Sequence, residues 1–251
     1  MTSGWFSRRK TWGLLFVLLA FGAVIGYLCA RQFIRCAGTS ARLQHIALAL
    51  HNYHGEYDCF PPQYVVDGQG KPAHSWRVLI LPYLGYGDLY ARYRFDEPWN
   101  GPHNRLLATE MPYEYRSPFL DSTSTVSQYV GIAGESTPWQ GATPLRWEDA
   151  SRSVGKTDSP DDVDSLVWFI EMANSDVHWM EPRDAPLEQA LVGLSVAGAG
   201  GVQSNYPDAL PVRTVLDSSG WIPVGTSRAR LLRRFTLHDS EQTDGQEQPS
   251  P

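Results

Sequence analysis

Residues 12–30 read WGLLFVLLAFGAVIGYLCA, a stretch that carries no charged side chain. As an α-helix at about 1.5 Å per residue it would be roughly 28 Å long, which matches the hydrocarbon core of a bilayer at about 30 Å. Basic residues stand on both sides, at positions 8–10 before the stretch and at Arg31 and Arg35 after it. The sequence therefore predicts a transmembrane helix over residues 11–30, through which the chain contacts the lipid bilayer.

Two other interpretations of this stretch are a cleaved secretory signal and a lipoprotein site at Cys29. The apolar core is longer than the about 7–15 residues usual in a signal peptide, and no small-x-small cleavage site follows it. Leu28 is bulky where a lipoprotein site has a small residue. We therefore favour an uncleaved single-span anchor, preceded by a short cytoplasmic flank over residues 1–10.

Charge divides the chain into a basic anchor and an acidic remainder. The net charge of the 251 residues is −6, but residues 1–42 hold six basic residues and no acidic ones, which leaves 15 basic and 27 acidic residues for the rest. The basic anchor suits anionic headgroups, and long domains translocate largely regardless of their charge. We expect a single-pass protein of the inner (cytoplasmic) membrane, with the N-terminus inside and the bulk of the chain periplasmic or at the cell surface.

The overall composition excludes several classes of protein. Hydrophobic residues make up 42% of the chain and aromatic residues 12%, which excludes a wholly disordered chain. Three cysteines are too few for a disulfide scaffold. The acidic total argues against nucleic acid as a partner.

A second helix is predicted directly after the anchor. Its apolar residues recur at helical spacing and form one stripe on a helix face. The stripe consists of Leu43, Ile46, Ala47, Leu50 and Tyr53. Ser40 could cap its start, and the chain could bend near Gly38. Gly55 and the following prolines predict that the helix ends at about residue 54.

The rest of the chain reads as a mixture of short helices and strands. We expect helical turns at 75–84, with Ser75 as cap, at 88–93, with Asp88 as cap, and at 104–110. Strands are expected at 128–132, 165–171, 191–196, 212–216 and 220–224. Residues 151–164 read as an acidic loop, and 238–251 as a disordered acidic tail. The prediction is an α+β domain over residues 31–237.

Several motifs occur in an order that resembles a known family. They are Leu-His-Asn-Tyr-His at 50–54, Phe-Pro-Pro at 60–62, Ser-Trp-Arg at 75–77, Leu-Pro-Tyr-Leu at 81–84, Asp-Glu-Pro-Trp-Asn-Gly-Pro-His-Asn at 96–104, Tyr-Arg-Ser-Pro at 115–118 and Trp-Met-Glu-Pro-Arg-Asp at 179–184. Together they resemble the large paralogous family of planctomycete proteins with a domain of unknown function and a prepilin-type N-terminus. The resemblance covers about residues 33–184.

The resemblance implies a fold and a location but no reaction. It implies a pilin-like layout in a bacterial cell envelope, with a long N-terminal helix, half of it in the membrane, packed on an α+β body with an antiparallel sheet. Prepilins carry a Glu near the start of the apolar run, whereas here no acidic residue precedes residue 56, which argues against filament formation. Ser117 replaces a usual Cys, and of the family's C-terminal pattern only Asp217–Ser219 is left, so the last third can differ from relatives.

The candidate ligand-binding residues are Asp96, Glu97, Trp99 and Asn100. Two carboxylates, an aromatic face and an amide on a loop rich in Pro and Gly could hold a sugar or a calcium ion, which prefers oxygen ligands.

The same loop also has a structural interpretation, which we favour. Pro98 and Pro102 would stiffen a turn, Trp99 would fill a gap in the core, and Asn104 would cap the next helix.

Other constellations give weaker signals. His51 and His54 lack a third metal ligand at suitable spacing. A helix between Cys36 and Cys59 would hold their Cα atoms far beyond the about 7 Å that a disulfide allows. The acidic residues at 158, 161, 162 and 164 fit no EF-hand loop, and the glycine-rich 198–201 lacks the Lys of a phosphate loop.

We therefore predict no catalytic residue, no metal ligand and no cofactor. The preferred hypothesis is a non-enzymatic, pilin-like cell-envelope protein with a structural, display or interaction role and with lateral protein partners in the envelope. The alternative is a membrane-tethered module that binds glycan or calcium through the 96–104 loop. A hydrolase would require a deep pocket that holds a nucleophile hydrogen-bonded to a histidine.

Overall fold

The computed structural model describes residues 3–152, 166–195, 200–214 and 219–237. The chain divides between Gly38 and Thr39 into two compact units, which are described separately. The unit that begins at Thr39 is called the body below. The described residues do not include the acidic loop from residue 153 onward, residues 198–199 of the glycine-rich segment, Asp217 and Ser218, or the tail 238–251.

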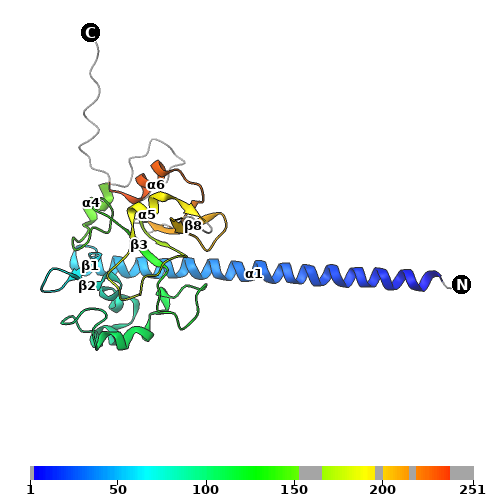
Figure 1. Cartoon of the computed structure of the whole chain (residues 1–251), viewed down its shortest axis with the longest axis horizontal. Coiled ribbons are helices and arrows are strands. Elements are labelled where there is room, and N and C mark those ends of the chain that lie inside the picture. The colour runs from blue at the N-terminus through cyan, green and yellow to red at the C-terminus, as the bar shows by residue number, and fades with distance from the viewer. Residues whose placement is uncertain (1–2, 153–165, 196–199, 215–218, 238–251) are drawn as a thin grey trace, which may run out of the picture. The chain divides into compact units, whose positions relative to one another are not determined.

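The N-terminal helix α1 runs from Ser3 to Tyr57 as one element (Figure 1). The predicted cap at Ser40 is wrong, because Gly38 and Ser40 both lie inside continuous helix. The helix also passes through Gly55, where a glycine costs only about 1 kcal/mol. It ends after Tyr57, because Asp58 adopts the left-handed conformation with φ 57° and Pro61 follows closely.

The body part of α1 buries the stripe that the sequence predicted. Leu43, Ile46, Ala47 and Leu50 are at most 1% exposed, and Tyr53 packs at the edge of the same core. Full burial of one such Leu or Ile side chain contributes about 1.5–3 kcal/mol. These residues share a cluster with four fully buried tryptophans and with strand residues, and the tryptophans are Trp76, Trp139, Trp168 and Trp179.

The main sheet has five strands in the order β5-β3-β4-β8-β9. Its strands are β3 (Tyr129–Ala133), β4 (Val167–Glu171), β5 (Ala185–Pro186), β8 (Ala209–Thr214) and β9 (Ser219–Pro223). All pairs are antiparallel except β3 with β5. The predicted α+β fold, with a long helix and a mainly antiparallel sheet, is confirmed (Figure 1).

Two small sheets and several short helices complete the body. Strands β1 (Tyr64–Val66) and β2 (Pro72–Ser75) form an antiparallel pair, and β6 (Leu194–Ser195) and β7 (Val202–Gln203) a parallel one. The helices are α2 (Trp76–Leu79), η1 (Leu81–Leu84), α3 (Gly87–Arg92), η2 (Asn104–Glu110), η3 (Tyr113–Tyr115), α4 (Trp147–Arg152), α5 (Leu187–Val192) and α6 (Arg228–Phe235).

The predicted helix caps match the structure in one case out of four, counting Ser40 above. The Ser75 side chain accepts the amide hydrogen of Arg77 and caps α2, as predicted. Asp88 lies inside the first turn of α3, whose cap is Tyr86, and Asn104 is the first residue of η2, whose cap is His103. These two cap predictions are wrong.

The C-terminal third departs most from the sequence prediction. The expected strand at 191–196 is described up to residue 195, and within that part only Leu194–Ser195 is strand, while α5 occupies residues up to Val192. The apolar run there serves as the buried face of a short helix, which a run of this length cannot distinguish from a strand. Strands β8 and β9 confirm the two later predictions, apart from their bounds.

Candidate functional site

The first candidate is the apolar surface of α1 in the N-terminal unit. Among the side chains described from residue 16 to residue 34, the large apolar ones are between 45% and 75% exposed. They are Phe16, Val17, Leu18, Leu19, Phe21, Val24, Ile25, Tyr27, Leu28, Phe33 and Ile34. By length and composition this part of the helix can cross a membrane, and a signal sequence shares the same properties.

The second candidate is a buried polar centre that joins two of the quoted motifs. Arg77, from Ser-Trp-Arg, and Asp184, from Trp-Met-Glu-Pro-Arg-Asp, form an ion pair whose side chains are both 0% exposed. The Asp184 carboxylate also accepts the indole N–H of Trp76 at 3.1 Å and the amide N–H of Gly131 at 2.9 Å. Burial raises the pKa of Asp184, and Arg77 opposes that shift.

The guanidinium of Arg77 also donates several hydrogen bonds besides its ion pair. Its Nη2 and Nε atoms donate to the carbonyl oxygen of Tyr129 at 3.0 and 3.3 Å, and its Nη1 donates to the Ser75 hydroxyl at 3.1 Å. A buried charge is tolerated only when it is paired and hydrogen-bonded. This centre ties β2, α2, β3 and the residue before β5 together, and its two charged side chains are shielded from solvent.

The third candidate is the 96–104 loop. The Glu97 carboxylate accepts the backbone N–H groups of His103 at 2.9 Å and Asn104 at 2.6 Å. The Asn104 side chain is fully buried and exchanges hydrogen bonds with the backbone of Arg94, at 2.9 and 2.7 Å, and donates to Pro98 at 3.1 Å. Glu97 and Asn104 therefore hold the loop in shape.

The structure separates the other candidate residues of this loop. Trp99 is half-buried, its backbone N–H donates to Ala73, and its ring lies 5.0 Å from the ring of His178. Asp96 and Asn100 are exposed. Burial lowers the pKa of His178, which keeps that imidazole neutral beside the indole. Among the described residues, no three His, Cys, Asp or Glu side chains gather closely enough to hold a metal ion.

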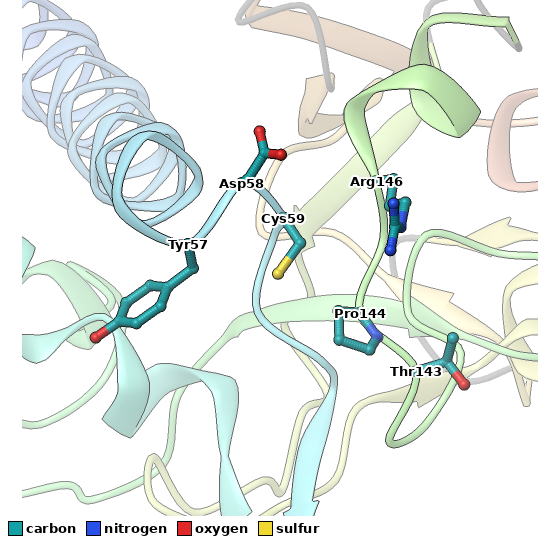
Figure 2. A pocket seen from close by; sticks show the side chains of 6 residues that line it. All are labelled: Tyr57, Asp58, Cys59, Thr143, Pro144 and Arg146. Atoms are coloured by element: carbon teal, nitrogen blue, oxygen red, sulfur yellow. The ribbon is translucent and has the colours of Figure 1, made fainter.

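A pocket of about 370 Å³ opens at the C-terminal end of α1 (Figure 2). Its lining residues are Tyr57, Asp58, Cys59, Thr143, Pro144 and Arg146. Figure 2 shows the sulfur of Cys59 directed into the space between Tyr57 and Pro144. Burial raises the pKa of the Cys59 thiol, and Arg146 only partly offsets this, so the thiol is protonated at neutral pH and a poor nucleophile.

A second pocket, of about 300 Å³, has Asp184 among its lining residues. Arg183 lines it and pairs with Asp176 at 2.8 Å and with Glu181 at 2.7 Å, and its hydrogen bond lowers the pKa of Asp176. Neither of the two pockets has a histidine in its lining. They therefore lend no support to a hydrolase.

No disulfide joins Cys29, Cys36 or Cys59, all of which lie in the described part of the chain. The sequence argument against a bond between Cys36 and Cys59 is confirmed. His51 packs edge-on against Phe60 at 5.7 Å between ring centroids, within an aromatic cluster.

A family model described as "Protein of unknown function (DUF1559)" matches residues 29–184, more than half of the chain. The chain belongs to the DUF1559 family. Searches of the curated proteins and of the solved structures found no significant match. The match confirms the unknown-function family of the resemblance, while its pilin-like and planctomycete parts stay predictions.

The DUF1559 region contains both partners of the buried ion pair and the whole 96–104 loop. It ends at Asp184, so helices α5 and α6 and strands β8 and β9 lie beyond it. The sequence pattern contains both motifs, but it did not predict the ion pair between Arg77 and Asp184. Arg77 follows Trp76 within an apolar run, and a charge buried there would require a partner, but no local feature distinguishes Asp184 from the neighbouring Glu181 and Arg183. Nothing in the sequence pointed to the pocket of Figure 2.

Proposed function

We propose that this DUF1559 protein is a single-span, membrane-anchored and pilin-like cell-envelope protein that displays its α+β body outside the cytoplasm. The observation that carries the proposal is the exposed apolar surface of α1 between residues 16 and 30, which holds no charged residue. The eight exposed Leu, Ile, Phe and Val side chains in this range favour insertion by about 0.3–0.6 kcal/mol each. Exposure of this apolar surface to water would be unfavourable.

The proposed role is structural or interactive rather than enzymatic. The polar groups of the quoted motifs are used inside the fold, as the Arg77–Asp184 pair and Glu97 illustrate. Helix α1 offers an apolar face to other envelope proteins in the plane of the membrane. Because no acidic residue precedes Glu56, we expect lateral partners but no pilus-type filament.

We do not extend the proposal to glycan or calcium binding by the 96–104 loop. The Glu97 carboxylate already accepts two backbone hydrogen bonds, and Asn104 is consumed by the loop backbone. Asp96 and Asn100 alone would be two exposed oxygen donors, fewer than the six to eight that calcium takes.

The test is the topology and processing of the full chain in a bacterial host. Tags at both ends are followed by protease treatment of cells with a permeabilised outer membrane, and the N-terminus of the membrane-bound chain is sequenced. We expect an N-terminus at residue 1 or 2 and loss of the C-terminal tag. A mature chain that begins after about residue 30 would show a signal sequence, and a protected C-terminal tag would place the body in the cytoplasm; either result refutes the proposal.

A matched pair of variants tests the anchor itself. Leu18→Arg with Val24→Arg places two charges in the apolar stretch, at a cost of about 2.5–3.5 kcal/mol each in a membrane, and should release the chain into the alkaline carbonate supernatant. Leu48→Arg with Leu106→Arg adds the same charges at exposed positions of the body and should leave it in the pellet. Equal behaviour of the two pairs would contradict anchoring by this stretch.

A further inference from the structure

A second buried carboxylate lies where α1 enters the body. Glu171, the last residue of β4, is 0% exposed. Its Oε1 accepts hydrogen bonds from the hydroxyls of Thr39, at 3.3 Å, and Ser117, at 3.2 Å. Unlike Asp184, it forms no salt bridge with the described residues. A carboxylate held mainly by neutral hydroxyls is poorly compensated for the loss of water.

These hydrogen bonds connect segments that are distant in sequence. Thr39 lies on α1, 132 residues before Glu171, and Ser117 follows η3. The hydroxyl of Tyr206, in the segment between β7 and β8, donates to Thr39 Oγ1 at 3.0 Å. One carboxyl group thus fastens α1 to the central strand of the sheet and to two connecting segments.

The groups that face Glu171 come from each of these elements. Arg42, one turn along α1 from Thr39, is 6% exposed, lies over the ring of Tyr113, and has a buried Nε without a hydrogen-bond partner. Tyr129 faces the cluster from β3, and burial, followed by the charge of Glu171, raises its pKa well above 10. Asn205, beside Tyr206, also contacts the carboxylate. Tyr129 is therefore neutral across the neutral pH range, and Glu171 is the carboxylic acid of this cluster.

We propose that Thr39, Ser117, Glu171 and Tyr206 form a pH-sensitive latch that holds residues 39–57 of α1 against the sheet, closed when Glu171 is protonated and weakened when it ionises. Burial raises the pKa of Glu171 from 4.5 to about 7, against the opposing effects of Ser117, Thr39, Arg42 and Asn205. The protonated carboxyl keeps its hydrogen bonds and carries no buried charge. The latch is a property of the folded body and goes beyond the proposed membrane role.

The direction of the pH effect follows from linkage. The pKa is higher in the folded chain than in the unfolded chain, so the stabilisation is complete below about pH 4.5 and is lost as the pH rises through about 7. The shift corresponds to a change on the order of 100-fold in the folding equilibrium constant between these limits.

The test uses the full chain in non-ionic detergent micelles at pH 5 and pH 8.5. Hydrogen exchange, corrected for the intrinsic pH dependence of amide exchange, is compared between peptides that cover residues 39–57 and peptides that cover 76–115. In the wild-type chain we expect protection of 39–57 to fall on the order of 100-fold at pH 8.5, and in Glu171→Gln we expect no such fall. Glu110→Gln, at an exposed carboxylate paired with Arg92, is the control and should behave as wild type.

Parallel pH profiles for wild type and Glu171→Gln would overturn the proposal. Should Glu171→Gln fail to fold, Thr39→Val provides an independent test, because it removes a hydrogen bond that favours the ionised carboxylate. Its midpoint of protection should move to higher pH than that of the wild type. An unchanged midpoint would equally contradict the latch.

Discussion

Replacement of Asp184 by Ala should destabilise the body more than any substitution at its surface. The change leaves the guanidinium of Arg77 buried without its counter-ion, which costs about 3–5 kcal/mol in buried pairs. It also removes the acceptor for the N–H groups of Trp76 and Gly131, at about 1–3 kcal/mol for each group left unsatisfied. Arg77 retains its hydrogen bonds to Tyr129 and Ser75, and such costs are not additive, so we expect a loss of about 4–6 kcal/mol.

Urea unfolding of the full chain in detergent micelles, followed by tryptophan fluorescence, measures this loss. The control is Asp176→Ala, which breaks the ion pair with Arg183 at a carboxylate that is 81% exposed and should cost less than about 1 kcal/mol. The double variant Arg77→Met with Asp184→Leu removes both charges and should recover much of the loss. A cost for Asp184→Ala no larger than that of Asp176→Ala would refute the reasoning.

Three further outcomes are expected. Gly131→Ala places a Cβ 2.4 Å from the ring of Trp139, which is 1% exposed and cannot retreat, so it should cost about 1–3 kcal/mol in the same urea assay. Asn104→Ala leaves buried backbone groups of its loop without hydrogen-bond partners and should lower the free energy of unfolding by about 3 kcal/mol. Asn100→Ala, at an exposed position, should stay within about 0.5 kcal/mol of wild type. Because Glu97 is occupied by the loop backbone, millimolar calcium should leave the melting temperature unchanged, and a rise that Glu97→Gln abolishes would contradict this.

The sequence predicted a helix correctly where the hydrophobic periodicity extends over several turns. The stripe from Leu43 to Tyr53 extends over three turns, and each of its members lies in or beside the core. The boundaries were less predictable. Gly55 was predicted to end the helix, yet a glycine within a long, otherwise favourable helix costs too little to end it.

The short elements were decided by tertiary contacts that no local pattern contains. Residues 187–192 form a helix because Leu187, Ala190 and Leu191 are buried on one side of α5, and a run this short satisfies a helix or a strand equally well. Asn104 reads as a cap, but its side chain reaches the backbone of Arg94 ten residues earlier. Such a contact depends on how the loop closes, which the sequence does not reveal.

The candidate site illustrates the same limit from the side of function. Asp, Glu, Trp and Asn on a Pro- and Gly-rich loop are the residue types that bind sugars or calcium, and they are also the types that fix irregular backbone. Geometry distinguishes the two uses. A ligand site leaves polar atoms accessible and without protein partners, whereas the side chains of Glu97 and Asn104 form hydrogen bonds with neighbouring backbone groups. The local sequence pattern does not show how the loop closes, and so it cannot distinguish a ligand site from a structural loop.

The distribution of satisfied and unsatisfied groups points to where this protein meets its surroundings. The charges that its motifs share, Arg77 and Asp184, are sealed and fully paired, so they specify the fold and do not report a substrate. Two features of the described residues are poorly compensated: the exposed apolar side chains between residues 16 and 34 lack an apolar environment, and Glu171 forms no salt bridge. In the proposed setting, a membrane would cover the apolar side chains and a proton would neutralise Glu171. A body held to its helix through a protonatable group, on a chain that lipid anchors, would respond to the acidity of the compartment into which it is displayed.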